Sequence, residues 1–192
     1  MMKHLSAAAL ALAGLLLMTG CQQEETAAPP PPFALTADAM GRYCGMNVLE
    51  HPGPKGQIIL RHLIEPIWFS SARDTLAFTM LPEEPRDIAA IYVSDMGTAP
   101  TWETPGATNW IDARKAHFVI GSAVRGGMGA REAVPFADLA QARAFIERNG
   151  GRVVGFDSIP PDYVLGADAD AGEDPAPAPS RDHDTGAGGN HG

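Results

Sequence analysis

Proline and glycine are concentrated toward the two ends of this chain of 192 residues, and their placement limits how much of it can fold. Four consecutive prolines stand at 29–32, and the segment Gly166–Gly192 is rich in glycine, proline and aspartate and holds no large apolar side chain. Such a segment cannot bury enough apolar surface to offset the entropy lost on ordering, so we expect residues 166–192 to be a disordered acidic tail. Residues 36–165 remain, and they are enough for one ordinary domain.

The first 20 residues are expected to be a signal peptide. Lys3 precedes an apolar run, Leu5–Leu17, that is shorter than the roughly 20 residues a membrane-spanning helix needs. The run ends in Leu-Met-Thr-Gly-Cys, the pattern of a bacterial lipobox, which predicts cleavage before Cys21 and lipidation of this cysteine. The alternative is an ordinary secretory cleavage near Thr19 and Gly20, which would leave Cys21 as an unmodified thiol.

Lipidation of Cys21 would anchor the mature chain to a membrane facing the periplasm without a spanning helix. Gln22 stands where aspartate would favour retention in the inner membrane, so the outer membrane is the default expectation. The prolines after it favour an extended conformation, and we expect residues 21–35 to be a tether that reaches up to about 45 Å from the lipid.

The charge and cysteine content exclude several classes of protein. Lysine and arginine number 14 against 23 aspartate and glutamate residues, a net charge of −9 that becomes −10 when the leader with Lys3 is removed. This balance argues against a nucleic-acid surface. Two cysteines cannot form a disulfide-stapled scaffold or a four-cysteine zinc site. In the tail, His183 and His191 could bind a metal weakly, although a solvated acidic tail is the simpler interpretation.

The hydrophobic pattern of residues 36–165 predicts an α+β fold of two ββαβ units, with helices packed on small mixed sheets. Each helix begins at a residue that can cap it. The expected strands are 57–63, 67–69, 88–94, 117–121, 133–136 and 152–156, and the expected helices are 70–80 and 138–149.

A spacing of aromatic residues supports the duplication. Phe69 stands nine residues before Phe78, and Phe136 stands nine residues before Phe145. Each of the later phenylalanines follows an alanine, and in both units an aspartate follows the last expected strand. Self-similarity at a fixed period is the sequence signature of a repeated unit, so we interpret the two halves as copies.

Cys44 and Met46 stand in a short glycine-containing segment that we predict to be a loop. If Cys21 carries lipid, Cys44 has no partner for a disulfide and is a single thiol in an oxidising compartment. A thiolate with a thioether is a soft donor set that suits Cu(I) and poorly suits Mg, Ca or Mn. The other interpretation is a buried structural cysteine, because free cysteine packs like a small hydrophobic residue.

Met128 is the next candidate donor, because it lies in a Gly-Gly-Met-Gly loop with no apolar neighbours in sequence against which to pack. A flexible loop whose methionine covers the edge of the core is the alternative. His51 lies in a rigid turn of prolines and glycines. We interpret it, in order of preference, as a structural hydrogen-bonding residue, as a residue that contacts the metal ligands, or as a ligand itself. Met96 is a spare donor.

The sequence holds no recognisable catalytic motif. It lacks a glycine-rich phosphate loop and the patterns G-x-S-x-G, H-E-x-x-H and C-x-x-C. Nothing assembles a nucleophile, a base and an orienting group at a recognisable spacing. We therefore predict a binding protein and not an enzyme; a passive interaction lipoprotein with an inert Cys44 is an alternative.

Four segments, taken together and in this order, resemble the NosL family: the lipobox, Cys-Gly-Met at 44–46, His-Pro-Gly-Pro-Lys-Gly-Gln at 51–57 and Gly-Gly-Met-Gly at 126–129. The resemblance covers residues 36–158. It implies a copper chaperone lipoprotein of nitrous oxide reductase maturation, with that reductase and an ABC-type assembly complex as partners. It also implies the duplicated ββαβ fold and Cu(I) ligation by Cys44, Met46 and Met128.

The same resemblance raises one further alternative. The family's fold is distantly similar to the organomercurial lyase domain, which suggests a thiol- or lyase-type enzyme; a lyase should need a second thiol or an acidic proton donor beside Cys44, and no second thiol is available. Some relatives carry a histidine before the glycine pair that ends the second helix. This chain has Asn149 there, so no histidine ligand is carried over.

Overall fold

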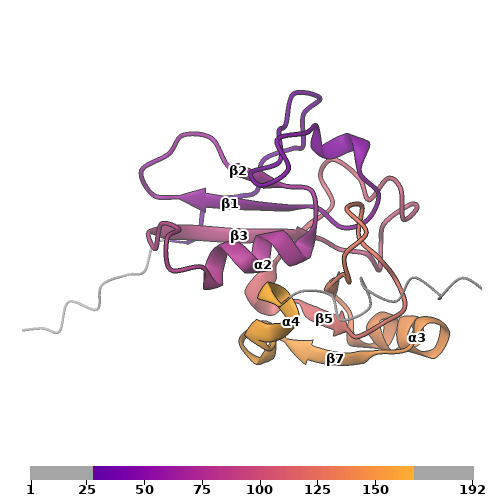
Figure 1. Cartoon of the computed structure of the whole chain (residues 1–192). Helices are drawn as coiled ribbons and strands as arrows, with labels where there is room; N and C mark the ends of the chain where they lie inside the picture. Colours follow the sequence, from indigo (N-terminus) through magenta and orange to yellow (C-terminus); the bar gives the residue numbers. More distant parts are fainter. Residues whose placement is uncertain (1–27, 167–192) are drawn as a thin grey trace, which may run out of the picture.

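Two small sheets, each carrying a helix between its second and third strands, make up residues 28–166, the part that the computed structural model describes (Figure 1). Cys21, the predicted signal peptide, His183 and His191 lie outside these residues. The elements in chain order are η1 (Val48–Glu50), β1 (Gly56–Leu60), β2 (Ile67–Phe69), α2 (Ala72–Met80), β3 (Ile88–Ser94), β4 (Trp110–Asp112), η2 (Ala113–Lys115), β5 (His117–Ile120), β6 (Val134–Phe136), α3 (Leu139–Asn149), β7 (Arg152–Gly155), η3 (Phe156–Ser158) and α4 (Pro161–Leu165).

The strand order confirms the predicted duplication. The first sheet has the order β2-β1-β3-β4 and the second β6-β5-β7. In each unit the first strand therefore lies between the second and the third, and along the chain the helix connects the second strand to the third. The helices begin as expected: the Ser71 and Asp138 side chains accept the backbone N–H of Asp74 and Gln141, each at 2.9 Å. The predicted α+β class is therefore confirmed.

The sheets are antiparallel where we expected mixed ones. Both neighbours of β1, and both neighbours of β5, run opposite to the central strand. In a ββαβ unit the helix connects two strands that run in the same direction, but the first strand lies between them, so no parallel pair forms. In the described part of the chain, the parallel pairing is a single bridge between Gly41 and Trp68.

The two phenylalanine pairs occupy the same place in both units. Phe69 ends β2 and contacts Phe78 on α2, with ring centroids 5.6 Å apart. Phe136 ends β6 and contacts Phe145 on α3 at 5.3 Å. Tilted and edge-on contacts at these distances are favourable for aromatic rings. The equal spacing in the sequence therefore reflects one repeated packing contact between strand and helix.

The main core lies between the two sheets. It combines Ile58 and Leu60 of β1, Phe78 of α2, Phe118 of β5 and Val164 of α4 in one buried cluster. Figure 1 shows α2 and α4 between the first sheet above and the second sheet below. The far face of the second sheet carries α3 over a smaller cluster. The helix of the first unit is thus enclosed, whereas the helix of the second unit is covered on one side.

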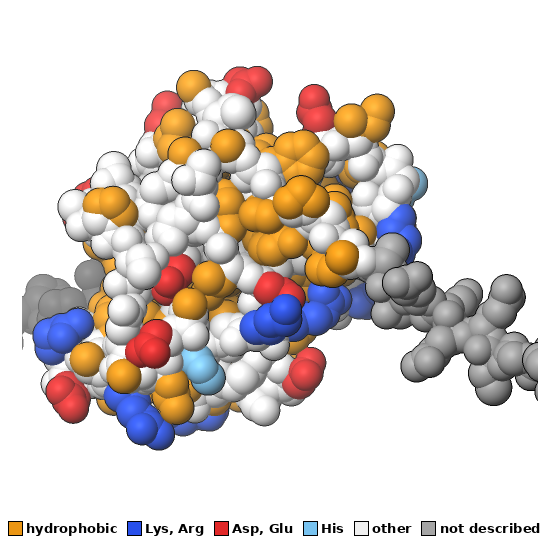
Figure 2. Space-filling view, turned by 180° about the vertical axis from the view of Figure 1, so that it is seen from behind, with side chains coloured by type: hydrophobic (Ala, Val, Ile, Leu, Met, Phe, Trp, Pro, Cys, Tyr) orange, Lys and Arg blue, Asp and Glu red, His pale blue; other side chains and the backbone are white. Residues whose placement is uncertain are grey.

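Part of the predicted tether lies on the back face of the first sheet. The Phe33 backbone N–H donates to the buried side chain of Gln57 at 2.8 Å, and the same amide donates back to the Phe33 carbonyl at 2.9 Å. Leu35 is buried with Ala39 and Val48. Figure 2 views this face and shows a continuous patch of apolar side chains across it. Phe33 and Leu35, which the sequence analysis assigned to the tether, therefore pack on the folded part of the chain.

Candidate metal centre

Cys44 and Met46 lie on a tight turn at residues 41–46. The Gly41 N–H donates to the Met46 carbonyl and the Gly45 N–H donates to the Gly41 carbonyl, both at 2.9 Å. Gly45 has a φ of 65°, in the left-handed region that glycine adopts without steric cost. The turn leaves the Cys44 side chain half-buried and the Met46 side chain 39% exposed. The predicted loop is confirmed, and its two sulfur-bearing residues are accessible.

The Cys44 thiol is held against the start of α2. Its Sγ lies 3.2 Å from the Ser70 Oγ, and Ser70 directly precedes the cap residue of the helix. The approach depends on a glycine, because a Cβ at Gly41 would lie 2.6 Å from the Cys44 Sγ and 2.7 Å from the Ser70 Oγ. Cys44 is a free cysteine that is only half-buried and contacts a hydroxyl, which fits the interpretation as a fully buried packing residue poorly.

Lys55 joins the segments around the thiol. This lysine is fully buried, and its Nζ donates to the backbone carbonyls of His51, of Pro52 at 3.3 Å and of Ser70 at 3.4 Å. Burial lowers the pKa of Lys55 to about 8, and the charges of Glu132 and Cys44 act in the opposite direction. A single ammonium group therefore fixes the 51–55 turn to the segment that contacts the thiol.

The loop of the second unit packs directly on that turn. A Cβ at Gly127 would lie 2.6 Å from the His51 Cβ and 2.8 Å from the Pro52 carbonyl oxygen, so no other residue fits without moving the turn. The loop is closed by a bond from the Gly129 N–H to the Gly126 carbonyl at 2.9 Å. Met128, between them, is 49% exposed, so it does not serve mainly to cover the core.

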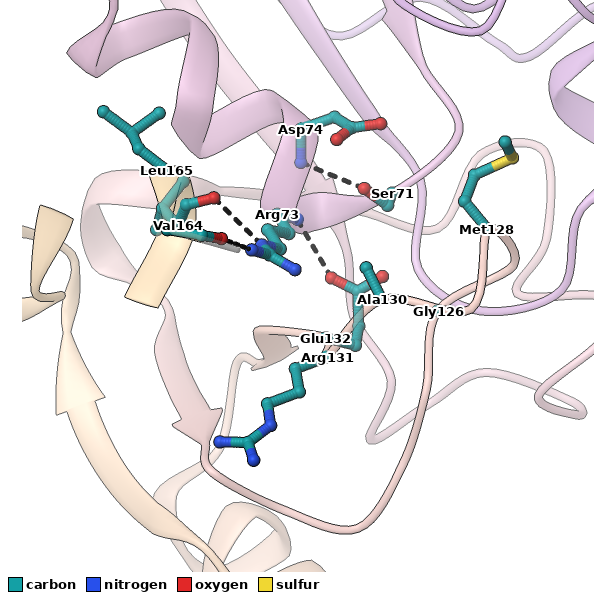
Figure 3. A pocket seen from close by; sticks show the side chains of 11 residues that line it. Ser71, Arg73, Asp74, Gly126, Met128, Ala130, Arg131, Glu132, Val164 and Leu165 are labelled. Carbon is teal, nitrogen blue, oxygen red and sulfur yellow. Dashed lines mark hydrogen bonds between the residues drawn. The ribbon is translucent and has the colours of Figure 1, made fainter. Parts of the chain in front are cut away.

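Met128 also lines a cavity of about 210 Å³ at the first turn of α2 (Figure 3). Ser71, Gly126 and Glu132 line the same cavity, and the Met128 side chain points away from Arg131. Ser70 contacts the Cys44 thiol and its neighbour Ser71 shares the cavity with Met128. The fold thus brings the two candidate loops, one from each unit, to the same end of α2.

Glu132 is a buried carboxyl group that the sequence analysis missed. Its Oε1 accepts the N–H groups of Arg73 and Ala133, both at 2.9 Å, while Oε2 is buried and has no hydrogen-bond partner among the described residues. Burial raises the pKa of Glu132 to about 8. Its one signal in the sequence is a charge directly before the apolar run Ala133–Phe136, where a strand begins.

His51 and Met96 differ in their surroundings. The His51 Nε2 is buried and has no hydrogen-bond partner in the described part of the chain, so the preferred interpretation, a structural hydrogen-bonding ring, finds no support at this nitrogen. Met96 packs against the apolar cluster under α3. Within residues 28–166, no group of three or more His, Cys, Asp and Glu side chains could hold a metal, and no helix is long and apolar enough to cross a membrane.

Comparison with known proteins places this arrangement in a family. The NosL family model matches residues 32–164. The chain belongs to the NosL family. The copper-binding lipoprotein NosL of Achromobacter cycloclastes is 46% identical over 157 residues, 81% of each chain. The protein of the same name from Stutzerimonas stutzeri is 34% identical over 143 residues, covering 74% of this chain and 73% of the relative.

A solved member of the family has the same fold. The crystal structure of the copper chaperone NosL from Shewanella denitrificans matches with a TM-score of 0.63 and 36% identity, covering 68% of this chain and 97% of that one. The match confirms both the predicted family and the α+β class. The described turn at 41–46, the 51–55 turn and the loop at 126–129 all lie within the residues that the NosL family model matches.

Proposed function

We propose that this chain is a copper chaperone lipoprotein: it binds Cu(I) through Cys44, Met46 and Met128 and carries it, on a lipid anchor at Cys21, to the assembly of nitrous oxide reductase. The observation that supports the proposal is that both candidate loops lie near the start of α2: the free thiol of Cys44 contacts Ser70, and Met128 lines a cavity with the next residue, Ser71. The names of the relatives, which are copper-binding lipoproteins and a copper chaperone, support it.

The donor types favour Cu(I) over other ions. A thiolate and thioethers are soft ligands, whereas Zn(II) takes nitrogen, thiolate or carboxylate donors and the hard divalent ions take oxygen. The described residues offer no cluster of His, Cys, Asp and Glu for those alternatives. The positive charge of buried Lys55 near Cys44 further disfavours an ion that brings two charges instead of one.

The exposure of the sulfurs suits a carrier. Met46 and Met128 each leave a large part of the side chain in solvent, so an incoming donor of an acceptor protein can reach the ion and replace them one at a time. Because copper binds the thiolate and not the thiol, uptake releases a proton and weakens at low pH. His51 is a further candidate donor, since its buried Nε2 lacks a hydrogen-bond partner in the described chain.

The enzyme alternative finds less support than the carrier. Cys44 is the one free cysteine of residues 28–166. Glu132 has the raised pKa of a proton donor, but its hydrogen bonds go to the backbone of Arg73 and Ala133, and none to the thiol is present in this region. An acid that donated a proton in a lyase reaction would need to reach the reacting group within hydrogen-bond distance.

The partners and location of the proposal follow from the family resemblance. We propose that the acceptor is the nitrous oxide reductase maturation system, with an ABC-type membrane complex, and that the protein faces the periplasm on a membrane, the outer membrane by default. A passive interaction lipoprotein with an inert Cys44 remains the competing function.

A competition titration with a chromophoric Cu(I) chelator tests metal binding. We compare the mature chain carrying Cys21→Ser with the same chain carrying Cys21→Ser and Cys44→Ser. Loss of the anionic donor should weaken Cu(I) binding at least ~100-fold, which corresponds to about 2.7 kcal/mol or more. Cys21→Ser is the matched control, because it also removes one thiol. Equal affinities in the two chains would contradict the proposal and favour the passive lipoprotein.

A further inference from the structure

The loop between β1 and β2 exposes apolar side chains at one end of the first sheet. Ile64 is 91% exposed and Leu63 is 42% exposed, and both line a groove with Phe33 and Ala28. We call Phe33, Leu63 and Ile64 the apolar rim. In Figure 1 this loop is the wide bend at the left end of β1 and β2. Nothing in the residues that the structure describes covers the rim, and exposed apolar side chains that gather in this way mark an interaction surface.

The chain toward the lipid anchor starts beside the same rim. The Pro30 carbonyl accepts the Tyr92 hydroxyl at 2.7 Å, and the two hydrogen bonds between Phe33 and Gln57 fix the next residues on the sheet. Ala28 therefore lies at the groove with Ile64. Cys21 is seven residues earlier, and a fully extended segment of that length spans at most about 25 Å. The anchor thus keeps the rim close to the bilayer surface.

We propose that the apolar rim docks on the lipid bilayer that holds the anchor; the proposal rests on the lipidation of Cys21 in the proposed function. Leucine and isoleucine side chains gain free energy on leaving water for the acyl region, and Phe33 extends the same surface. Arg61 and His62 beside them are exposed and can stay among the head groups, whereas Glu65 on the same loop opposes a strong electrostatic attraction. The apolar side chains therefore carry the contact.

Docking at the rim orients the candidate metal centre. β1 begins at Gly56, beside Lys55 and the 51–55 turn, and ends at Leu60, where the rim loop starts. A strand of this length rises about 13 Å between its ends. Both candidate loops lie near the Gly56 end: Cys44 contacts Ser70, which accepts from Lys55, and the loop at 126–129 packs on the 51–55 turn. With the rim on the lipid, Cys44, Met46 and Met128 lie at the end of the sheet that points away from the bilayer, where an acceptor can reach them.

The experiment measures partitioning of the mature chain, residues 21–192 carrying Cys21→Ser, onto vesicles of phosphatidylethanolamine and phosphatidylglycerol. Without the lipid, membrane binding depends on the protein surface alone. Leu63→Ser with Ile64→Ser should lower the partition coefficient at least ~10-fold, because each side chain contributes up to about that factor when it leaves water. The matched control is Leu165→Ser on α4, where the leucine is 45% exposed at another place on the surface; it should change partitioning less than twofold.

Two results would overturn docking on lipid. One is equal partitioning of the parent chain and the double variant. The other is a parent chain that dimerises in sedimentation velocity without vesicles while the double variant stays monomeric, which would make the rim an interface between copies. Cu(I) affinity, measured on the parent chain and on the double variant, should be the same, since the rim lies at the opposite end of β1 from the candidate metal centre. A negative result for lipid docking would therefore leave the proposal of copper binding intact, and a negative result for copper binding would leave the proposal of docking intact.

Discussion

The hairpin loop between the first two strands differs between the two units in length and in the side chains that it exposes. In the first unit it is short, residues 61–66, and carries the exposed Leu63 and Ile64. In the second unit it runs from 121 to 133 and carries Met128 on a glycine-rich segment that reaches back to the first unit. Equivalent positions of one duplicated fold thus present an apolar loop in one copy and a thioether in the other.

The helices differ in a related way. Six residues of α2 are buried, including Leu76 and Phe78, while Ala142 is the one buried residue of α3. The reason is position: α2 lies between the first sheet and the second unit, and α3 covers an outer face. The enclosed side of the first unit also holds the buried charge of Lys55, just before the cap of α2, because the carbonyls of His51, Pro52 and Ser70 replace the lost water. The first unit therefore supplies the more enclosed part of the candidate metal centre.

The two phenylalanine pairs give the largest expected difference. Phe78→Ala removes a fully buried ring from α2 and should lower the free energy of unfolding by about 3–5 kcal/mol. Phe145→Ala removes the equivalent, half-buried ring from α3 and should cost about 1–2 kcal/mol, since less apolar surface returns to water. Urea denaturation of both variants measures this. Equal losses would show that the two units are enclosed to the same degree.

The next effect is on the pH dependence of stability. The pKa of Glu132 is about 8 in the folded protein against 4.5 in the unfolded chain, because the carboxyl is buried. Between these values the folded state keeps a proton that the unfolded state has released, so stability falls as pH rises from about 4.5 to 8. Above pH 8, Lys55 acts in the opposite sense: the folded state has lost a proton that the unfolded lysine keeps up to 10.5, so its burial penalty declines.

Glu132→Gln should flatten the fall below pH 8. The glutamine carbonyl can still accept the N–H groups of Arg73 and Ala133, so stability at pH 5 should change little. At pH 8 the variant should be more stable than the parent chain by on the order of 2 kcal/mol. The parent chain must take up a proton on Glu132 or bury its charge when it folds, and glutamine needs neither. Chemical denaturation at both pH values tests this, and an unchanged slope in the variant would mean that Glu132 ionises normally in the folded state.

Much of the fold could be predicted because its signals are local. The hydrophobic runs predicted five of the strands to within one residue, and the cap residues Ser71 and Asp138 marked both helices. The short strand β4 and the last helix α4 were missed; each has fewer than six residues, too short for a period to show. Mixed sheets were expected because the sequence does not reveal which strand of a unit lies at its centre.

The candidate site could be predicted only in part. Cys44, Met46 and Met128 stand out because a lone thiol and a glycine-flanked methionine are unusual in themselves. Lys55 and Glu132 do not, because a lysine in a turn and a glutamate before a strand are ordinary surface residues until folding buries them. The hydrogen bond between Phe33 and Gln57 could not be predicted either, because it joins two segments that are distant in the sequence.

The smallest predicted effect decides whether both units bind the metal. Met46→Leu and Met128→Leu each keep the side-chain volume and remove the sulfur, so each should weaken Cu(I) binding about 3–10-fold with little change in the free energy of unfolding. Met40→Leu is the matched control, because Met40 is a similarly exposed methionine with no proposed role in the site. Competition titrations of the three variants provide the measurement. If Met46→Leu weakens binding and Met128→Leu does not, the second unit contributes no donor, and its glycine loop serves only to pack against the 51–55 turn. If Met40→Leu weakens binding as much as the others, the effect belongs to exposed methionines in general and not to a defined metal centre.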